Sequence, residues 1–260
     1  MKAVPIVDKM DLWKKAVGLR KQLGRDASSP VDILELVIAN IERSKHFTMV
    51  LYPMGDRLSG MCVKGDSCTV IAINSAMSVG RQRFSMAHEL FHVYFDNSLS
   101  TAICSRKIGV GSDIEREADQ FASYFLMPPD ALTGEIGQIK QKADDRLTVG
   151  NVVKLEQHFG VSRQAILFRL VEEKELTSQE AEPMRHDVIN SARNLGYDDF
   201  LYKPLPLEKQ HMTYGYYVQQ AEESLKEGLI SNGKYEELLL EAFRSDLVYG
   251  EASEGSESVD

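Results

Sequence analysis

The chain has 260 residues, of which 43% are hydrophobic and 27% charged, and its formal net charge is −9. This length allows one large domain, or one domain with a smaller companion, and the composition is that of an ordinary globular protein. No apolar run approaches the roughly 18 residues of a membrane span, and the charged N-terminus lacks the apolar core of a signal peptide. These features predict a cytoplasmic protein without a membrane anchor.

The placement of charge and of cysteine argues against two kinds of site. Residues 1–111 contain 15 Lys and Arg against 10 Asp and Glu, whereas residues 112–260 contain 15 against 29. An acidic second half disfavours broad contact with nucleic-acid phosphates. Cys62, Cys68 and Cys104 form no C-x-x-C pair, so neither a disulfide framework nor a cysteine-based zinc site is expected.

The N-terminal part of the chain changes from helical to strand periodicity. Helices are predicted over residues 9–23 and 30–44. Three short alternating or β-branched runs follow at 47–53, 58–65 and 67–74, separated by turn residues. We interpret these runs as a three-stranded antiparallel meander.

The middle of the chain returns to helical periodicity. Helices are predicted at about 80–95 and 113–127, joined by a less ordered link over 97–111. The second helix ends at "MPPD", because proline cannot continue a helix. A further helix, a break at Gly160 and another helix then form a helix-turn-helix-like segment over 147–178.

The C-terminal region is predicted to be mostly helical. An extension over 179–249 contains helices at 211–229 and 234–245, and the acidic tail 250–260, rich in Ser and Gly, is predicted to be disordered. The overall expectation is an α+β protein. Residues 1–146 form one domain with a small antiparallel sheet and active-site helices, and the helical region follows it.

The sequence "HELFH" at His88–His92 contains the residues that could bind a metal ion and activate a water molecule. Residues four apart in a helix share one face, so His88 and His92 can bind one metal ion, as in the H-E-x-x-H pattern of zinc sites. Glu89 lies about 100° around the helix, where it can act as the base that activates a metal-bound water without being a ligand. The alternative is an ordinary amphipathic helix that carries two histidines on its surface.

A catalytic zinc ion takes three protein ligands and leaves one position for water. The next predicted helix offers Glu115 as the third ligand, with Asp119 one turn further, placed to bind the second nitrogen of a ligating histidine. Glu117 is a rival ligand, and Glu115 has an alternative role because Ser112-x-x-Glu115 is a capping-box pattern. Asp119 is alternatively a solvated carboxylate. The arrangement predicts Zn2+ as the cofactor, with Mn2+ as the alternative.

The segments "RQRFSMAHELFH" and "IEREADQFASYFLMP" together resemble the ImmA/IrrE family of metallopeptidases. The resemblance covers roughly residues 30–175. It implies a zincin-like fold and metallo-endopeptidase activity of the gluzincin type. Characterised members cut a helix-turn-helix (XRE-type) repressor and so switch on genes, which implies such a repressor as the partner. Phe91 stands where many members have Gly, and we expect it to pack in the core.

Carried over residue by residue, the resemblance assigns the same roles as the spacing. His88, His92 and Glu115 become metal ligands, and Glu89 becomes the catalytic base. Asp119 stands at the position where the family has Asn or Asp.

Two further parts of the site are predicted less directly. The candidate donors to an oxyanion are Tyr94, Tyr124, His158 and Arg83, each of which has a structural role as its alternative. By its resemblance to the edge strand of the family, one strand is predicted to pair with an extended substrate. Its residues are Thr69, Val70, Ile71, Ala72, Ile73 and Asn74.

The helix-turn-helix-like segment has Arg163, Gln164 and Arg169 on its second helix, but its apolar residues are typical of a core and the following "EEKE" is acidic. Direct DNA binding is therefore not expected. The leading hypothesis is a regulatory zinc-dependent endopeptidase that cleaves an XRE-type repressor. The alternatives are a non-catalytic zincin scaffold that binds a repressor or toxin, and a DNA-binding regulator with a metal site. No oligomeric state is predicted.

Overall fold

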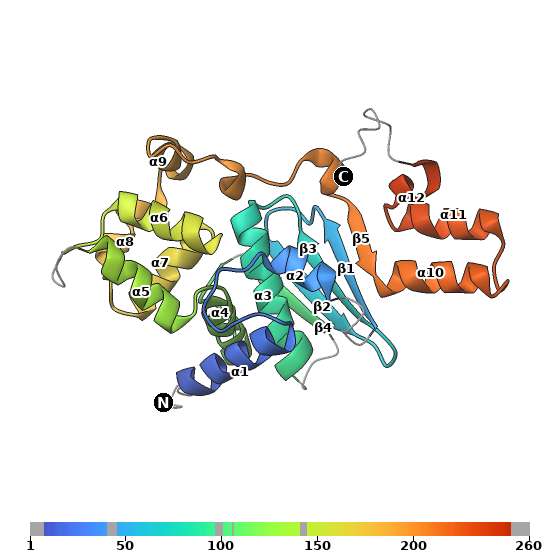
Figure 1. Ribbon diagram of the computed structural model, residues 1–260, viewed down its shortest axis with the longest axis horizontal. Helices are drawn as coiled ribbons and strands as arrows, with labels where there is room; N and C mark the ends of the chain where they lie inside the picture. Colours follow the sequence, from blue (N-terminus) through green and yellow to red (C-terminus); the bar gives the residue numbers. More distant parts are fainter. Residues whose placement is uncertain (1–7, 41–45, 97–100, 106, 141–144, 251–260) are drawn as a thin grey trace.

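The computed structural model describes residues 8–40, 46–96, 101–105, 107–140 and 145–250. It has the expected α+β fold with a helical C-terminal region, built around one five-stranded sheet (Figure 1). None of the described helices combines the length and the apolar character needed to cross a bilayer. The predicted disordered tail lies outside the described residues.

The first half of the chain contains the sheet and the helices packed on it. Its elements are α1 (Lys9–Gln22), α2 (Ile33–Ala39), β1 (Phe47–Tyr52), β2 (Leu58–Lys64), β3 (Thr69–Asn74), α3 (Val79–Phe95), β4 (Thr101–Ser105) and α4 (Asp113–Leu126). The second helix begins at Ile33 rather than at residue 30, because the Asp32 carboxylate caps it by accepting from the Leu34 and Glu35 N–H groups.

The second half is helical except for one strand. Its elements are α5 (Pro129–Ile139), α6 (Val149–Phe159), α7 (Arg163–Glu172), α8 (Ser178–Ala181), α9 (Val188–Arg193), β5 (Met212–Gly215), α10 (Tyr216–Lys226), α11 (Asn232–Glu241) and α12 (Ser245–Tyr249), with short 3-10 turns at Pro183–Arg185, Phe200–Tyr202 and Leu207–Lys209. Figure 1 shows α5–α9 on one side of the sheet and α10–α12 on the other, joined by the chain that crosses above it.

The sheet is mixed, with strand order β4-β2-β3-β1-β5. β1 runs parallel to β3, whereas β2 is antiparallel to both β3 and β4, and β5 is antiparallel to β1. The predicted antiparallel meander is therefore wrong, since β1 and β2 are not neighbours. Both edge strands were missed because β4 is short and lies in the predicted link, and the four residues of β5 run directly into a helix.

The position of β3 overturns its predicted role in binding substrate. Both backbone edges of this strand are paired, one with β1 and the other with β2. It therefore has no free edge for an extended peptide, and the edge-strand expectation for Thr69–Asn74 is wrong. The apolar character of the strand reflects its central place, where Ile71 and Ile73 are fully buried.

The helix α3 connects the sheet to the helix-turn-helix-like pair α6–α7. Phe91 on α3 is buried, as expected, with its ring 5.6 Å from the ring of Phe121 on α4. At the start of α3, a Cβ on Gly80 would lie only 2.7 Å from the backbone nitrogen of Ser162. This glycine allows the first turn of α3 to pack directly against the turn between α6 and α7.

The basic side chains on α7 face the protein interior. Arg163 is buried and forms an ion pair with Glu156 of α6. Arg169 is fully buried, and its guanidinium lies 4.3 Å from the centre of the Tyr124 ring. These two arginines stabilise the packing of α7 and are not presented to a phosphate backbone.

Candidate active site

Three predicted metal ligands meet at one point between α3 and α4. The Nε2 atoms of His88 and His92 are 3.3 Å apart. The two carboxylate oxygens of Glu115 lie 3.4 Å from His88 Nε2 and 3.3 Å from His92 Nε2. Two atoms bound at about 2.0–2.1 Å to a tetrahedral ion are roughly 3.4 Å apart, so these distances fit three ligands of one zinc ion. Within the described chain, Glu115 belongs to this group of ligand atoms and Glu117 does not.

The other nitrogen of each histidine is bound by a carboxylate. His88 Nδ1 donates to Asp119 Oδ1 at 2.8 Å, and His92 Nδ1 donates to Asp96 Oδ2 at 3.0 Å. A proton on Nδ1 leaves the Nε2 lone pair free for a metal. The second oxygen of Asp119 accepts from the Gly109 N–H at 2.5 Å, so Asp119 is a buried, bound carboxylate rather than a solvated one. Asp96 was missed, although it follows His92 by one helical turn.

Glu89 lies beside this centre and is fully buried. Its oxygens accept no hydrogen bond from an N–H or O–H group of the described chain, and its neighbour is the Cys104 thiol. The strand β2 leaves room for it at Gly60, where a Cβ would lie 2.7 Å from Glu89 Oε1. A buried carboxylate with so few partners is typical of a functional group. The sequence did not predict a role for Gly60, because this role depends on the packing of β2 against α3.

Comparison with known proteins identifies the segment that carries these residues. Residues 54–171 match the family model of the IrrE N-terminal-like domain, Peptidase_M78. This segment is a domain of that peptidase family. The match includes α3, α4 and the α6–α7 pair, and it confirms the resemblance to the ImmA/IrrE metallopeptidases. The chain has no significant match among curated proteins.

The electrostatics of this peptidase domain favour a positive charge at the centre. Burial alone would lower the pKa of His88, but hydrogen bonds with Asp119 and Glu115 and the charge of Glu89 outweigh it and raise the pKa to about 10. Burial opposes ionisation of Glu115, yet hydrogen bonds with His88 and His92 lower its pKa to about 2. The carboxylates therefore stabilise a cation at this point, whether a proton or a metal ion.

A fourth potential ligand comes from the sheet. The ligand atoms of His88, His92, Glu115 and Cys104 all lie within 4.8 Å of one another. Nitrogen, oxygen and sulfur donors of this kind suit Zn2+ and related divalent metals. The lack of a C-x-x-C pair argued against cysteine at a zinc site. The fold nevertheless brings Cys104 from β4 to the histidines, and no spacing along the chain shows this.

Each of the four candidate oxyanion donors contacts another side chain or backbone group. These contacts are Arg83 with Asp32 and Gly160, Tyr124 with Arg169, His158 with Glu135, and Tyr94 with Phe95. The contacts of Arg83, Tyr124 and His158 join different helices and turns, whereas Tyr94 and Phe95 are neighbours on α3. These contacts agree with structural roles, and the expectation that one of the four donates to an oxyanion stays a prediction.

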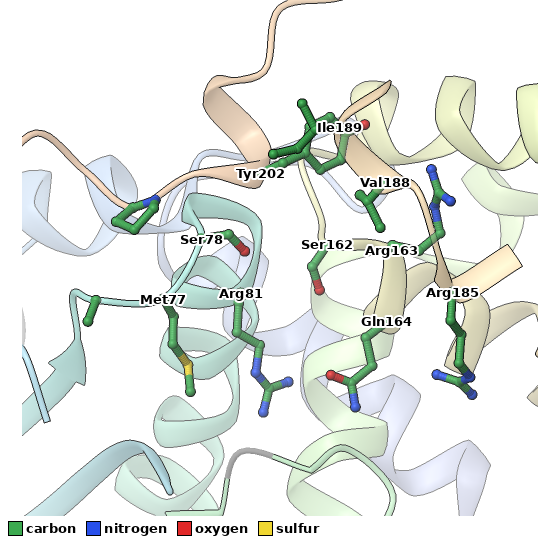
Figure 2. A pocket seen from close by; sticks show the side chains of 12 residues that line it. Met77, Ser78, Arg81, Ser162, Arg163, Gln164, Arg185, Val188, Ile189 and Tyr202 are labelled. Carbon is green, nitrogen blue, oxygen red and sulfur yellow. The ribbon is translucent and has the colours of Figure 1, made fainter. Parts of the chain in front are cut away.

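A separate cleft of about 650 Å³ lies at the start of α3, where α7 and the chain around α9 meet it. Figure 2 shows Arg81, Gln164 and Arg185 extending in the same direction along this cleft. Its lining includes none of the predicted metal or catalytic residues. This cavity lies where residues 76–81 and 162–164 of the matched segment meet residues 185–204, which follow it.

Proposed function

We propose that the protein is a zinc-dependent endopeptidase whose metal is held by His88, His92 and Glu115. The convergence of the two Nε2 atoms and the Glu115 carboxylate, at 3.3 to 3.4 Å from one another, carries this proposal. A His2Glu set favours zinc, with manganese as the alternative. The metal supplies Lewis acidity, which polarises a peptide carbonyl and makes a water molecule easier to deprotonate.

Glu89 is the proposed general base. It follows His88 directly on α3, so its carboxylate lies beside the ligand atoms without being one of them. Burial raises its pKa and so makes it a better proton acceptor than an exposed glutamate. In this role Glu89 takes a proton from the attacking water and returns it to the leaving amine. Asp119 and Asp96 keep both imidazoles in the orientation that binds the metal.

The strand β4 is the better candidate for substrate pairing. In the described sheet it is an edge strand, bound to β2 alone. Its residue Cys104 reaches the ligand atoms, so the free backbone edge of β4 lies close to the centre. An extended peptide that adds to this edge would have its carbonyl groups near the metal ligands. The mode requires a substrate with an unfolded or exposed segment.

The proposed substrate is an XRE-type repressor, which the resemblance to the ImmA/IrrE family supports. The proposal includes a cytoplasmic location, which the free thiols of Cys62, Cys68 and Cys104 support. Burial of Arg163 and Arg169 argues against a DNA-binding role for α7. Docking of the repressor on the α6–α7 pair is compatible with its position beside α3.

The test compares the zinc-loaded wild type with Glu89→Gln on XRE-type repressors from the source genome and on an unfolded general substrate. We expect both proteins to bind equal zinc, and the rate of cleavage by the variant to fall about 10²- to 10⁴-fold. Mass spectrometry of the fragments identifies the cut bond. Full activity of the variant would contradict the role of Glu89.

Two other outcomes would favour the alternative functions. Binding of the repressor without cleavage by either protein would favour the non-catalytic scaffold. A gel shift of DNA by the wild type at physiological salt would favour the DNA-binding regulator.

A further inference from the structure

Cys104 lies next to the three proposed metal ligands, although a catalytic site with three protein ligands needs no fourth one. Its sulfur lies within 4.8 Å of the ligand atoms of His88, His92 and Glu115, and the residue is only 1% exposed. The three other ligands come from the helices α3 and α4, whereas Cys104 approaches from β4 in the sheet. Donors from three elements thus surround one centre. A catalytic zinc site normally leaves the fourth position to water.

We propose that Cys104 is a fourth ligand that closes the metal site in the resting protein, and that it must leave before a peptide can be hydrolysed. This inference rests on the proposed metallopeptidase function and concerns the regulation of the same site. A four-ligand site with no open position is typical of structural zinc, which does not catalyse. The Cys104 thiol would convert the catalytic site into such a closed site.

The replacement of the water by Cys104 at the fourth metal position balances in protons and charge. Binding of Cys104 would break its S–H bond, form a bond from the sulfur to the ion and release the water that otherwise holds the fourth position, while the proton passes to the neighbouring Glu89 carboxylate. A divalent ion with one carboxylate from Glu115 and one thiolate is electrically neutral, and protonated Glu89 adds no charge. Closure therefore occupies the position of the water and also consumes the base. Release of Cys104 restores both.

A further observation concerns the release of Cys104 from the site. In the described sheet β4 pairs with β2 alone, so withdrawal of Cys104 requires the movement of one edge strand and leaves the rest of the sheet intact.

Substitution with cobalt tests the inference by spectroscopy. The wild type, Cys104→Ala and Cys68→Ala are loaded with one equivalent of Co2+, and their absorption spectra are compared. We expect the intense near-ultraviolet band of thiolate-to-cobalt charge transfer in the wild type and in Cys68→Ala, since Cys68 lies outside the ligand group. The band should be absent in Cys104→Ala. Cys104→Ser, which keeps the size of the side chain, serves as a second variant if the alanine protein does not fold.

The remaining outcomes separate the inference from the proposed function. Loss of a ligand should weaken zinc binding about tenfold or more, as even the loss of a group that supports a ligand does. With Cys104 removed, the initial rate of peptide cleavage should rise severalfold. A wild-type cobalt spectrum without the band, a band that survives Cys104→Ala, or a fall in cleavage rate would overturn the inference and leave the peptidase function standing. A wild type that binds no cobalt would overturn the metal-dependent function itself.

Discussion

Asp119 on α4 holds His88 on α3 through a hydrogen bond of 2.8 Å between Oδ1 and Nδ1. The other oxygen of Asp119 binds the backbone N–H of Gly109, which lies just before α4. One carboxylate thus joins the two helices that carry the proposed metal ligands and the segment that leads into the second of them. It orients the imidazole and also fixes the position of α4 relative to α3.

Replacement of Asp119 by Asn should weaken metal binding. The amide keeps the size of the side chain but removes the charge that makes the His88 imidazole a strong ligand, so we expect affinity for zinc to fall about 10- to 100-fold. Competition with a chromophoric chelator measures the change. Asp113→Asn is the matched control, because Asp113 lies on the same helix and pairs with Arg116 at the surface. Equal affinity of Asp119→Asn and the wild type would rule out this role.

Bound metal should distinguish the two candidate acids on α4. Elemental analysis of the wild type, after equilibration with zinc and removal of the excess, should find about one ion per chain. Glu115→Ala should lose most of this metal because Glu115 contacts both histidines. Glu117→Ala should retain it. A loss in Glu117→Ala with none in Glu115→Ala would reverse the assignment.

Gly80→Ala should destabilise the protein although alanine favours a helix. Helix propensity alone would gain about 1 kcal/mol. The new Cβ, however, would lie 2.7 Å from the backbone nitrogen of Ser162 and 2.8 Å from the carbonyl carbon of Val161, and backbone cannot move aside as a side chain can. Overpacking costs about 1–3 kcal/mol, so we expect a net loss of unfolding free energy in urea.

The control for this substitution is Gly134→Ala. Gly134 lies within α5, and a Cβ there would meet nothing within 4 Å. This variant should gain about 0.5–1 kcal/mol from helix propensity. If both variants became more stable, the close packing of α3 against the α6–α7 turn would be disproved.

The metal-free protein should lose stability as the pH rises. The folded pKa of His88 is about 10, raised from 6.5, so its stabilising contribution is complete below pH 6.5 and disappears as the pH approaches 10. For Glu115 the shift is opposite, to about 2 from 4.5, and its contribution is lost only as the pH falls below 4.5 toward 2. Melting temperatures of the chelator-treated protein should therefore fall between pH 6.5 and 10.

Two controls isolate the histidine. In the zinc-loaded protein the metal replaces the proton, so the fall in melting temperature over this range should be smaller. In metal-free His88→Gln the part of the fall caused by His88 should be absent, because glutamine does not titrate. The prediction is wrong if the metal-free wild type, the zinc-loaded wild type and His88→Gln all follow the same curve.

Much of the site could be predicted from local spacing. The helical period places His88 and His92 on one face, and it places Glu115 and Asp119 on one face of the next helix. The same rule could have revealed Asp96, four residues after His92, as the partner of its second nitrogen. These relationships follow from sequence because a helix determines the directions of residues three and four apart, whatever it packs against.

Tertiary structure decided the features that depend on strand pairing. The order β4-β2-β3-β1-β5 moved the predicted substrate strand from the edge of the sheet to its centre. It also brought Cys104 to the histidines, and it placed Gly60 where the Glu89 carboxylate needs room. Strand partners are chosen by contacts between distant segments, and the alternation of side chains along a strand does not encode its neighbours. The sequence by itself therefore determined which helix faces carry the proposed ligands. Only the packing of the sheet decided which strand residues, such as Cys104 and Gly60, lie next to those ligands.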